Sequence, residues 1–303
     1  MRVVPLILPM IWLWFAPRTT AQDSAQLEIG GGKIDVIFSS APAEPLRRLV
    51  LGWVASSARA VTVYYDQFPV SHLQIQLRFF EGSGVRGGRT TSWAGPAIAI
   101  AAGRASSASD FTEDWVLTHE MVHLAFPSVP EEHHWIEEGS ATYVEPIARA
   151  RAGDLTPEKV WGDLVDGLPQ GLPRPGDRGL DFTPTWGRTY WGGALFCLLA
   201  DIEIRKRTRN KKGLEDALRA VLKAGGTIES DWPLTRTLEI GDRATGVPVL
   251  RELYDKMKAS PVPVDLGALW KELGVTRRSG KTEFDDGAPL TAIRKAITQP
   301  ALR

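Results

Sequence analysis

The pentapeptide His119-Glu120-Met121-Val122-His123 lies in a stretch of helical character and decides the fold of this chain. Two histidines four positions apart lie on one helix face, one turn apart. Both imidazoles can therefore reach one zinc ion at roughly 2.0–2.1 Å. Glu120 lies about 100° further round the helix than His119. From this position its carboxylate is better placed to contact a water bound to the metal than to bind the metal itself. The spacing predicts two metal ligands and a general base, as in metalloproteases.

The clustering of histidine favours this interpretation over a helix with two unrelated histidines. The chain has five histidines, and four of them fall within residues 119–134. A catalytic zinc site also needs a third protein ligand and an open position for water. The metzincin pattern would place a glycine at position 126 and a histidine at 129, so Phe126 and Val129 exclude that class.

The third ligand is predicted from the stretch Trp135-Ile136-Glu137-Glu138-Gly139-Ser140-Ala141-Thr142-Tyr143. It resembles the glutamate helix of the gluzincins, in which the glutamate directly before Gly-x-Ala-x-Tyr binds the metal. The resemblance implies that Glu138 is the third ligand, with Glu137 as its competitor, and that each chain holds one Zn²⁺. Fourteen residues separate Glu138 from His123. This interval is similar to that of the peptidase MA-like and glycyl aminopeptidase families, and shorter than that of the alanyl aminopeptidases.

The segment between the two predicted zinc helices indicates a short turn. Pro127 and Pro130 end the first helix, so that the second helix returns antiparallel and offers a carboxylate from its first turns. His133 and His134 fall in this turn or at the helix start, where we expect exposed polar residues. Glu145 lies about two turns beyond the metal-binding glutamate, on the same face. It is either a partner that orients a ligand histidine or an ordinary solvated glutamate.

The segment Thr189-Tyr190-Trp191-Gly192-Gly193 is similar to the Tyr-x-x-Gly segment of gluzincin aminopeptidases, whose tyrosine donates a hydrogen bond to the tetrahedral oxyanion. The resemblance gives this role to Tyr190, although Gly192 replaces the lysine that is usual in the family. Such a donor contributes only if it is aimed at the charge that develops in the transition state. The alternative is a tyrosine packed at a helix N-terminus. The nearby Arg188 either grips a substrate carboxylate or lies on the surface.

Residues 1–21 differ from the rest of the chain, which has an ordinary globular composition. A short apolar core follows Arg2, and Thr19-Thr20-Ala21 provides small residues, which is typical of a secretory signal peptide cleaved after Ala21. An uncleaved anchor is the alternative. The remaining chain has a formal charge of −2, which favours neither nucleic acid nor an anionic membrane as partner. Its single cysteine, Cys197, excludes an intrachain disulfide. We expect a secreted or periplasmic protein without stable membrane insertion after cleavage.

Apolar patterning and the gluzincin resemblance together predict an α+β fold. It has a thermolysin-like zincin core, a small N-terminal β-sheet and a mainly helical C-terminal part. The predicted organisation is a signal peptide (1–21), an N-terminal β/α part of the catalytic domain (22–102), a zinc-binding helical core (103–210) and a helical C-terminal region (211–303).

Individual elements follow from hydrophobic periodicity. We expect a hairpin over 26–40, strands over 71–80 and 96–101, and helices over 44–68, 188–208, 214–224, 249–258, 266–273 and 289–297. The Gly82–Gly88 run predicts a flexible loop. The first zinc helix is expected to start near Asp110, with Glu113 completing a capping box.

The resemblance also implies a substrate-binding edge. In thermolysin-like folds the strand before the first zinc helix forms one wall of the cleft, where an extended peptide pairs with the free strand edge. Gly95–Ile100 is the predicted edge, and Trp93 beside it is the tryptophan that we expect to contact substrate. The Gly-x-Met-x-Asn segment, which helps to bind the substrate near its amino terminus in alanyl aminopeptidase-type enzymes, is absent.

These features predict a secreted zinc-dependent peptidase that acts on peptide or protein substrates. His119, His123 and Glu138 would hold zinc, Glu120 would act as general base, and Tyr190 would donate to the oxyanion. Two alternatives stay open. One is a catalytically silent relative that binds peptides or envelope partners, and the other is a zinc amidase that acts on cell-wall peptides.

Overall fold

The computed structural model describes residues 23–300, and a five-stranded mixed sheet opens the described chain. The strands are β1 (Ser24–Ile29), β2 (Gly32–Phe38), β3 (His72–Phe80), β4 (Val85–Thr91) and β5 (Ala97–Gly103). Their order in the sheet is β1-β2-β3-β5-β4. Strands β2, β3 and β5 run parallel, and the edge strands β1 and β4 run antiparallel to their neighbours.

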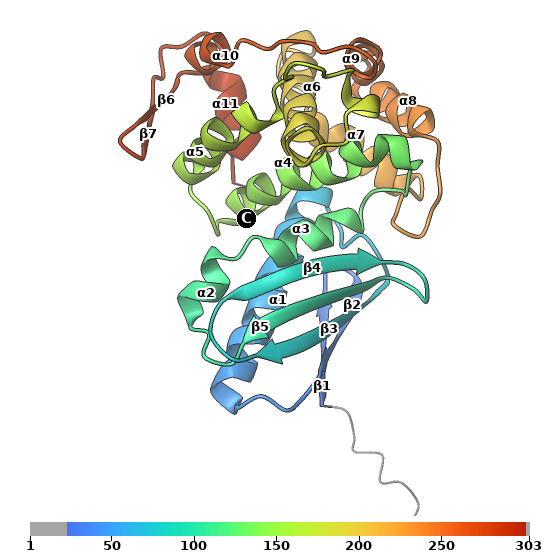
Figure 1. Cartoon of the computed structure of the whole chain (residues 1–303), viewed down its shortest axis with the longest axis vertical. Helices are drawn as coiled ribbons and strands as arrows, with labels where there is room; N and C mark the ends of the chain where they lie inside the picture. The colour runs from blue at the N-terminus through green and yellow to red at the C-terminus, as the bar shows by residue number, and fades with distance from the viewer. Residues whose placement is uncertain (1–22, 301–303) are drawn as a thin grey trace, which may run out of the picture.

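Helices make up most of the remaining chain, which confirms the predicted α+β class. They are α1 (Glu44–Tyr65), α2 (Ala108–Glu113), α3 (Val116–His123), α4 (His134–Ala152), α5 (Pro157–Gly167), α6 (Gly193–Arg207), α7 (Leu214–Lys223), α8 (Leu234–Thr245), α9 (Val249–Met257), α10 (Leu266–Leu273) and α11 (Thr291–Thr298). In Figure 1 the sheet occupies the lower part of the molecule and most helices the upper part, with α3 between them. None of the described helices is both long and apolar enough to cross a membrane.

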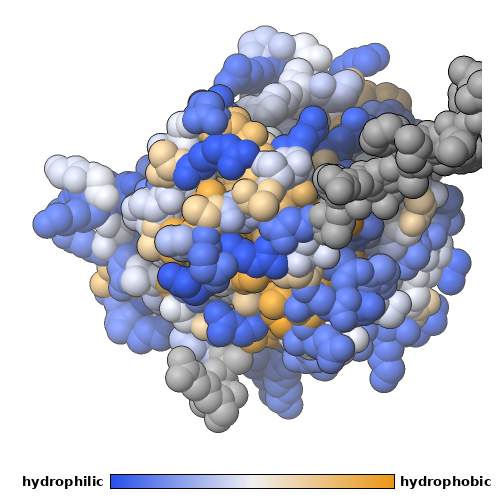
Figure 2. Space-filling model, turned by 90° about the horizontal axis from the view of Figure 1, so that it is seen from below, coloured by the Kyte–Doolittle hydropathy of each residue, from blue (hydrophilic) through white to orange (hydrophobic). Residues whose placement is uncertain are grey.

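Helix α1 forms where the sequence predicts it, because its apolar residues repeat at helical spacing. Leu46, Val50, Trp53 and Val54 lie on one buried face. Pro45 sits in the first turn, where a missing backbone N–H costs nothing. The predicted hairpin and the strand β3 are also present, and their buried residues join those of α1 in one core. Viewed from the sheet end, the surface is mainly hydrophilic, with smaller apolar areas between the polar residues (Figure 2).

The edge of the sheet beside the zinc helix differs from the prediction. The Gly82–Gly88 run is a loop only in its first half, because β4 begins at Val85. This strand pairs with β5, so residues 97–103 are enclosed between β3 and β4 and Gly95–Ile100 is not an edge. The sequence of β4 lacks apolar alternation, and a bulge between Arg86 and Gly88 interrupts its register. Hydrophobic periodicity could therefore not predict this strand.

The predicted start of the first zinc helix is also wrong. A short helix α2 covers residues 108–113, and its capping contact joins the Asp110 carboxylate to the backbone N–H of Ser107 at 2.7 Å. Glu113 ends that helix and caps nothing. The helix α3 begins separately at Val116, where both carboxylate oxygens of Asp114 accept backbone N–H groups of its first turn.

The helical part contains elements that periodicity did not reveal. Helices α5 and α8 and the hairpin of β6 (Val275–Arg278) and β7 (Lys281–Phe284) were not predicted. The predicted helices over 214–224, 249–258, 266–273 and 289–297 are present with small shifts at their ends. The segment over 188–208 begins with a π-helical turn at Gly187–Gly192 before α6. The predicted signal peptide lies outside the described residues.

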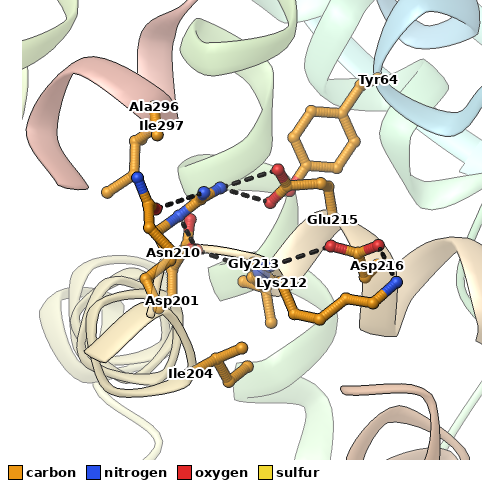
Figure 3. Close-up of polar contacts among 12 residues, drawn as sticks. Tyr64, Asp201, Ile204, Asn210, Lys212, Gly213, Glu215, Asp216, Ala296 and Ile297 are labelled. Carbon is orange, nitrogen blue, oxygen red and sulfur yellow. Dashed lines mark hydrogen bonds and ion pairs between the residues drawn. The ribbon is translucent and has the colours of Figure 1, made fainter. Parts of the chain in front are cut away.

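A buried network of charged side chains joins α4, α6 and α7 (Figure 3). Nε of Arg205 lies 2.7 Å from Asp201, and its Nη2 lies 2.7 Å from Glu215. Arg151 of α4 reaches the same Glu215 at 3.0 Å. The hydroxyl of Tyr143 donates to Asp201 at 2.8 Å. Because these charged side chains have more than one partner each, the network holds together the helices that position the candidate functional site.

Candidate metal centre

Three side chains from α3 and α4 converge on one point. Nε2 of His119 lies 3.1 Å from Oε2 of Glu138 and 3.3 Å from Nε2 of His123. Nε2 of His123 lies 3.5 Å from the same carboxylate oxygen. This triad is the one group of at least three potential metal-binding side chains that comes together within residues 23–300. The structure thus brings together all three residues predicted as ligands.

The spacing of these three atoms fits a zinc ion. Tetrahedral coordination at about 2.0–2.1 Å requires ligand atoms roughly 3.3–3.4 Å apart. The three observed separations scatter closely around that value. The donor set of two imidazoles and one carboxylate is also that of catalytic zinc sites, which leave a fourth position for water. The residues present therefore fit the metal that the sequence predicts.

Glu138 rather than Glu137 faces the histidines. Oε1 of Glu137 accepts the backbone N–H of Val129 at 2.8 Å and so braces the turn between α3 and α4. Its other oxygen lies 2.9 Å from Nδ1 of His134. The far nitrogen of His134 reaches Oε1 of Glu138 at 3.4 Å. His134 therefore bridges the two glutamates, and the hydrogen bond to Glu137 raises its pKa.

The prediction that both turn histidines are exposed loop residues is wrong. The side chain of His134 is partly exposed and contacts a ligand carboxylate. His133 is partly buried, and its Nδ1 lies 3.0 Å from Asp181. Asp181 also accepts hydrogen bonds from Trp135 and Tyr254, which fixes the start of α4. Both histidines thus support the position of the helix that carries the third ligand.

Burial and mutual contact set the ionisation of the triad. Burial lowers the pKa of His119, which keeps its imidazole in the neutral form that binds a metal. Burial acts in the same direction on His123, but the hydrogen bond to Glu138 and the charges of the nearby glutamates together outweigh it and raise the pKa. Burial would raise the pKa of Glu138, yet the two histidines hold it well below its usual range. Glu138 is therefore a carboxylate at neutral pH, as a ligand must be.

Glu120 occupies a different side of α3 and faces the edge strand β4. Its side chain is 8% exposed. The hydroxyl of Thr90 lies 2.6 Å from Oε2 of Glu120 and 2.8 Å from its main-chain oxygen. Gly88 lies against the same side chain, because a Cβ atom at residue 88 would meet Cγ of Glu120 at 2.5 Å. Neither Thr90 nor Gly88 was predicted, since the strand itself was not recognised.

Tyr190 also lies at the centre. Its ring stacks on that of His119 with 6.2 Å between centroids and an interplanar angle of 20°. Burial, followed by the charge of Glu138, raises the pKa of Tyr190 to about 12. The phenol is therefore protonated at neutral pH and available as a hydrogen-bond donor. The π-helical turn that carries it shows that the local backbone is not a regular helix start.

A close backbone contact brings this turn to the metal-binding helix. A Cβ on Gly139 would lie 2.3 Å from Cα of Gly193, so α4 and α6 meet where neither residue has a side chain. Both glycines are buried. The contact gives a structural reason for the glycine that follows Glu138, and it places Tyr190 within reach of the triad.

Exposed tryptophans adjoin the centre. Trp115, directly before α3, is 54% exposed and packs edge-on against His119 at 5.5 Å between centroids. Trp186 is 60% exposed and stacks on Tyr190 at 5.6 Å. Trp93, the tryptophan predicted to contact substrate, is 98% exposed beyond the end of β4. The aromatic surface nearest the triad therefore comes from Trp115 and Trp186.

Neither alternative for Arg188 or Glu145 is correct. Arg188 is buried, and its Nε lies 2.8 Å from Asp177 while its Nη1 donates to the main-chain oxygen of Gly171. It therefore anchors the loop before the π-helical turn. Glu145 is buried rather than solvated, and it accepts from Arg149 at 2.9 Å rather than from a ligand histidine.

Solved structures with a similar fold include an aminopeptidase N family protein and an M1 zinc metallopeptidase. An aminopeptidase N family protein from Idiomarina loihiensis aligns with a TM-score of 0.62 and 15% identity, over 84% of this chain and 50% of that one. An M1 zinc metallopeptidase from Deinococcus radiodurans bound to a Tyr-Ser-Ala substrate aligns with a TM-score of 0.53 and 17% identity, over 81% and 53%. Similarity at these identities establishes a shared fold. The chain spans about half the length of these structures.

No protein-family model matches the sequence, and no match was found among curated proteins. The described residues therefore have an α+β, zincin-like fold with a candidate metal centre.

Proposed function

We propose that this chain is a zinc-dependent peptidase of the gluzincin type, related to the MA-like and glycyl aminopeptidase families and exported by its N-terminal signal. The observation that carries the proposal is the spacing of His119, His123 and Glu138, whose ligand atoms lie 3.1–3.5 Å apart. Three such atoms from two helices match the ligand set of a catalytic zinc, while a general base and a phenol stand beside them.

The chemistry of the chain's own residues follows from their positions. Zinc, when bound, would polarise the scissile carbonyl and make water more acidic. Glu120 would take a proton from the attacking water and later deliver it to the leaving amine. The hydroxyl of Tyr190 would donate to the oxyanion of the tetrahedral intermediate, which forms only during reaction. Trp115 and Trp186 would offer aromatic surface to side chains beside the scissile bond.

The experiment that tests the proposal is digestion of a mixed peptide library, read by mass spectrometry. The mature protein should cleave peptides when zinc is present, lose activity with a chelator, and recover it when zinc is restored. Each peptide should be supplied with a free and with an acetylated amino terminus. Because the Gly-x-Met-x-Asn segment is absent, we expect acetylated peptides to be cleaved as well.

Two outcomes would favour other functions. Stoichiometric zinc without cleavage of any peptide would indicate a catalytically silent relative that binds peptides or envelope partners. Cleavage of cell-wall muropeptides but not of casein or the library would indicate a zinc amidase. Detection of the protein in the periplasm or medium, with an amino terminus at residue 22, would establish export and cleavage after Ala21.

A further inference from the structure

We propose that Thr90 is the positioning residue for Glu120, and that Gly88 makes room for the carboxylate it holds. This inference rests on the proposed function, because it concerns the general base of that reaction. Thr90 belongs to β4, the edge strand that the sequence concealed. In Figure 1 this strand runs beside α3, and the two elements are in contact. The role of that contact would be to position Glu120.

The hydroxyl of Thr90 meets one carboxylate oxygen of Glu120 at 2.6 Å. Hydrogen bonds from a hydroxyl to an ionised carboxylate have this length. Within residues 23–300, Thr90 is the one side chain that donates a hydrogen bond to this carboxylate. Oε2 accepts this hydrogen bond, so Oε1 is the oxygen without a side-chain donor and the one we assign to accept a proton from water.

A glutamate needs such a partner because its side chain has several freely rotating bonds. A general base must lie within hydrogen-bond reach of the proton it removes. A misplacement of about 1 Å can lower the rate roughly 100-fold. Glu120 lies on a different side of α3 from His119 and His123, and within residues 23–300 its carboxylate makes no hydrogen bond to the triad. The contact with Thr90 supplies the missing constraint from another element.

Gly88 completes the arrangement. Residues 88 and 90 are two positions apart on β4 and therefore project to the same face of the strand. A Cβ on Gly88 would lie 2.5 Å from Cγ and 2.7 Å from Oε1 of Glu120. A side chain at this position would displace the oxygen that Thr90 leaves free. Gly88 thus leaves space for the Glu120 carboxylate, and Thr90 on the same face of the strand holds it by a hydrogen bond.

A purely structural role for Thr90 is the competing interpretation. Its hydroxyl also lies 2.8 Å from the main-chain oxygen of Glu120, which would tie β4 to α3 whatever the side chain did. A structural tie predicts lost stability, whereas a positioning role predicts lost turnover with unchanged stability and substrate binding. The two roles are therefore separable by measurement.

The test compares T90V, T90S and the matched control T91V in the zinc-loaded protein. Thr90→Val keeps the shape of the side chain and removes the hydroxyl, while Thr90→Ser restores the hydroxyl. Thr91 is the next residue on β4 and projects to the opposite face. For each variant, kcat, KM, zinc content and Tm are measured with a peptide that the wild-type protein cleaves. We expect T90V to lower kcat roughly 10- to 100-fold, with KM within about threefold of wild type.

T90S tests whether the restored hydroxyl recovers activity, and T91V is the control on the same strand. T90S should recover most of the lost kcat, and T91V should match the wild type. All variants should keep zinc. Wild-type kcat in T90V, an equal loss in T91V, or no recovery in T90S would overturn the proposal. A lower Tm in T90V with unchanged kcat would establish the structural tie instead.

A second readout does not depend on turnover. In crystals of T90V the Glu120 carboxylate should turn from its wild-type position or occupy more than one conformation, while α3 and β4 stay in place. An unmoved carboxylate would overturn the positioning role. If the wild-type protein cleaves no peptide, the proposed function fails, but this comparison still decides whether Thr90 holds Glu120.

Discussion

The phenol ring of Tyr190 lies nearly parallel to the imidazole of His119, with 6.2 Å between their centroids. The two residues come from segments that are far apart in the sequence. The close approach of Gly139 to Gly193 joins α4, which follows the helix of His119, to α6, which follows the turn of Tyr190. Burial, followed by the charge of Glu138, raises the pKa of Tyr190 to about 12. A protonated phenol at this place is suited to stabilise negative charge that develops on substrate.

Replacement of Tyr190 by Phe should lower kcat by roughly 10²–10³ with KM nearly unchanged, because an oxyanion donor acts in the transition state. Steady-state kinetics with a cleaved peptide measure both constants. Tyr143→Phe provides the comparison, since the Tyr143 hydroxyl donates to the buried Asp201. That change should reduce stability and leave kcat almost unaltered. A Tyr190 variant with normal kcat and reduced Tm would assign the hydroxyl to packing.

The metal prediction is that the mature protein binds about one zinc per chain. Replacement of His123 or Glu138 by Ala should remove most of the metal, as measured by elemental analysis after dialysis. Glu137→Ala is the matched control, because Glu137 is bound to Val129 and His134 rather than to the ligand histidines. Its zinc content should stay near that of the wild type. If Glu137→Ala lost the metal and Glu138→Ala retained it, Glu137 rather than Glu138 would be the third ligand.

Replacement of Glu120 by Gln should leave zinc in place and lower peptide hydrolysis by at least about 100-fold, the range expected for loss of a general base. Glutamine preserves the size of the side chain and still accepts the hydrogen bond from Thr90, but it does not take up a proton. Kinetics and elemental analysis on the same preparation separate the two effects. Wild-type turnover in this variant would end the proposed mechanism.

Removal of one partner from the buried network around Asp201 should destabilise the helical part, because it leaves a buried charge with fewer partners (Figure 3). Asp201→Ala leaves Arg205 with one carboxylate fewer and removes a cap on the backbone N–H of Leu214. Loss of one partner of a buried pair costs about 3–5 kcal/mol, measurable by urea unfolding. Glu203→Ala removes an exposed pair from the same helix and should cost at most about 1 kcal/mol. Equal losses of unfolding free energy in the two variants would show that the buried network stabilises the protein no more than the exposed pair does.

The last prediction concerns pH. Burial raises the pKa of Glu145 to about 7, against the opposing effect of Arg149. An unfolded glutamate titrates near 4.3, so the folded protein holds a proton that the unfolded chain releases. The resulting stability is fully present below about pH 4.3 and is lost as the pH rises through about 7. The loss should be on the order of 3–4 kcal/mol.

Glu145→Gln removes this titration and keeps an acceptor for Arg149. Urea unfolding of both proteins at pH 5 and pH 8 gives the comparison. The wild type should lose stability relative to the variant as the pH rises. A constant difference between the two proteins at both pH values would mean that Glu145 is ionised throughout.

Two of the three residues of the triad could be predicted from sequence spacing, because that information is local. The spacing of His119 and His123 places two imidazoles on one helix face whatever surrounds the helix. The choice of Glu138 over Glu137 came from the resemblance to the gluzincin glutamate helix, in which a glycine follows the glutamate, and the structure explains that glycine by its contact with Gly193. The long helix α1 followed from hydrophobic periodicity, and the α+β class from that periodicity together with the resemblance.

The surroundings of the triad depend on long-range packing and could not be predicted from local sequence. The strand β4 has no periodic signature, because an edge strand with two adjacent glycines buries few side chains. Its pairing with β5 removed the predicted edge and brought Thr90 to Glu120. Local periodicity also did not reveal the burial of Arg188 and Glu145, although their partners Asp177 and Arg149 are near them in sequence. Local periodicity records which face of an element is apolar, whereas the identity of the neighbour on that face is fixed only when the whole chain packs.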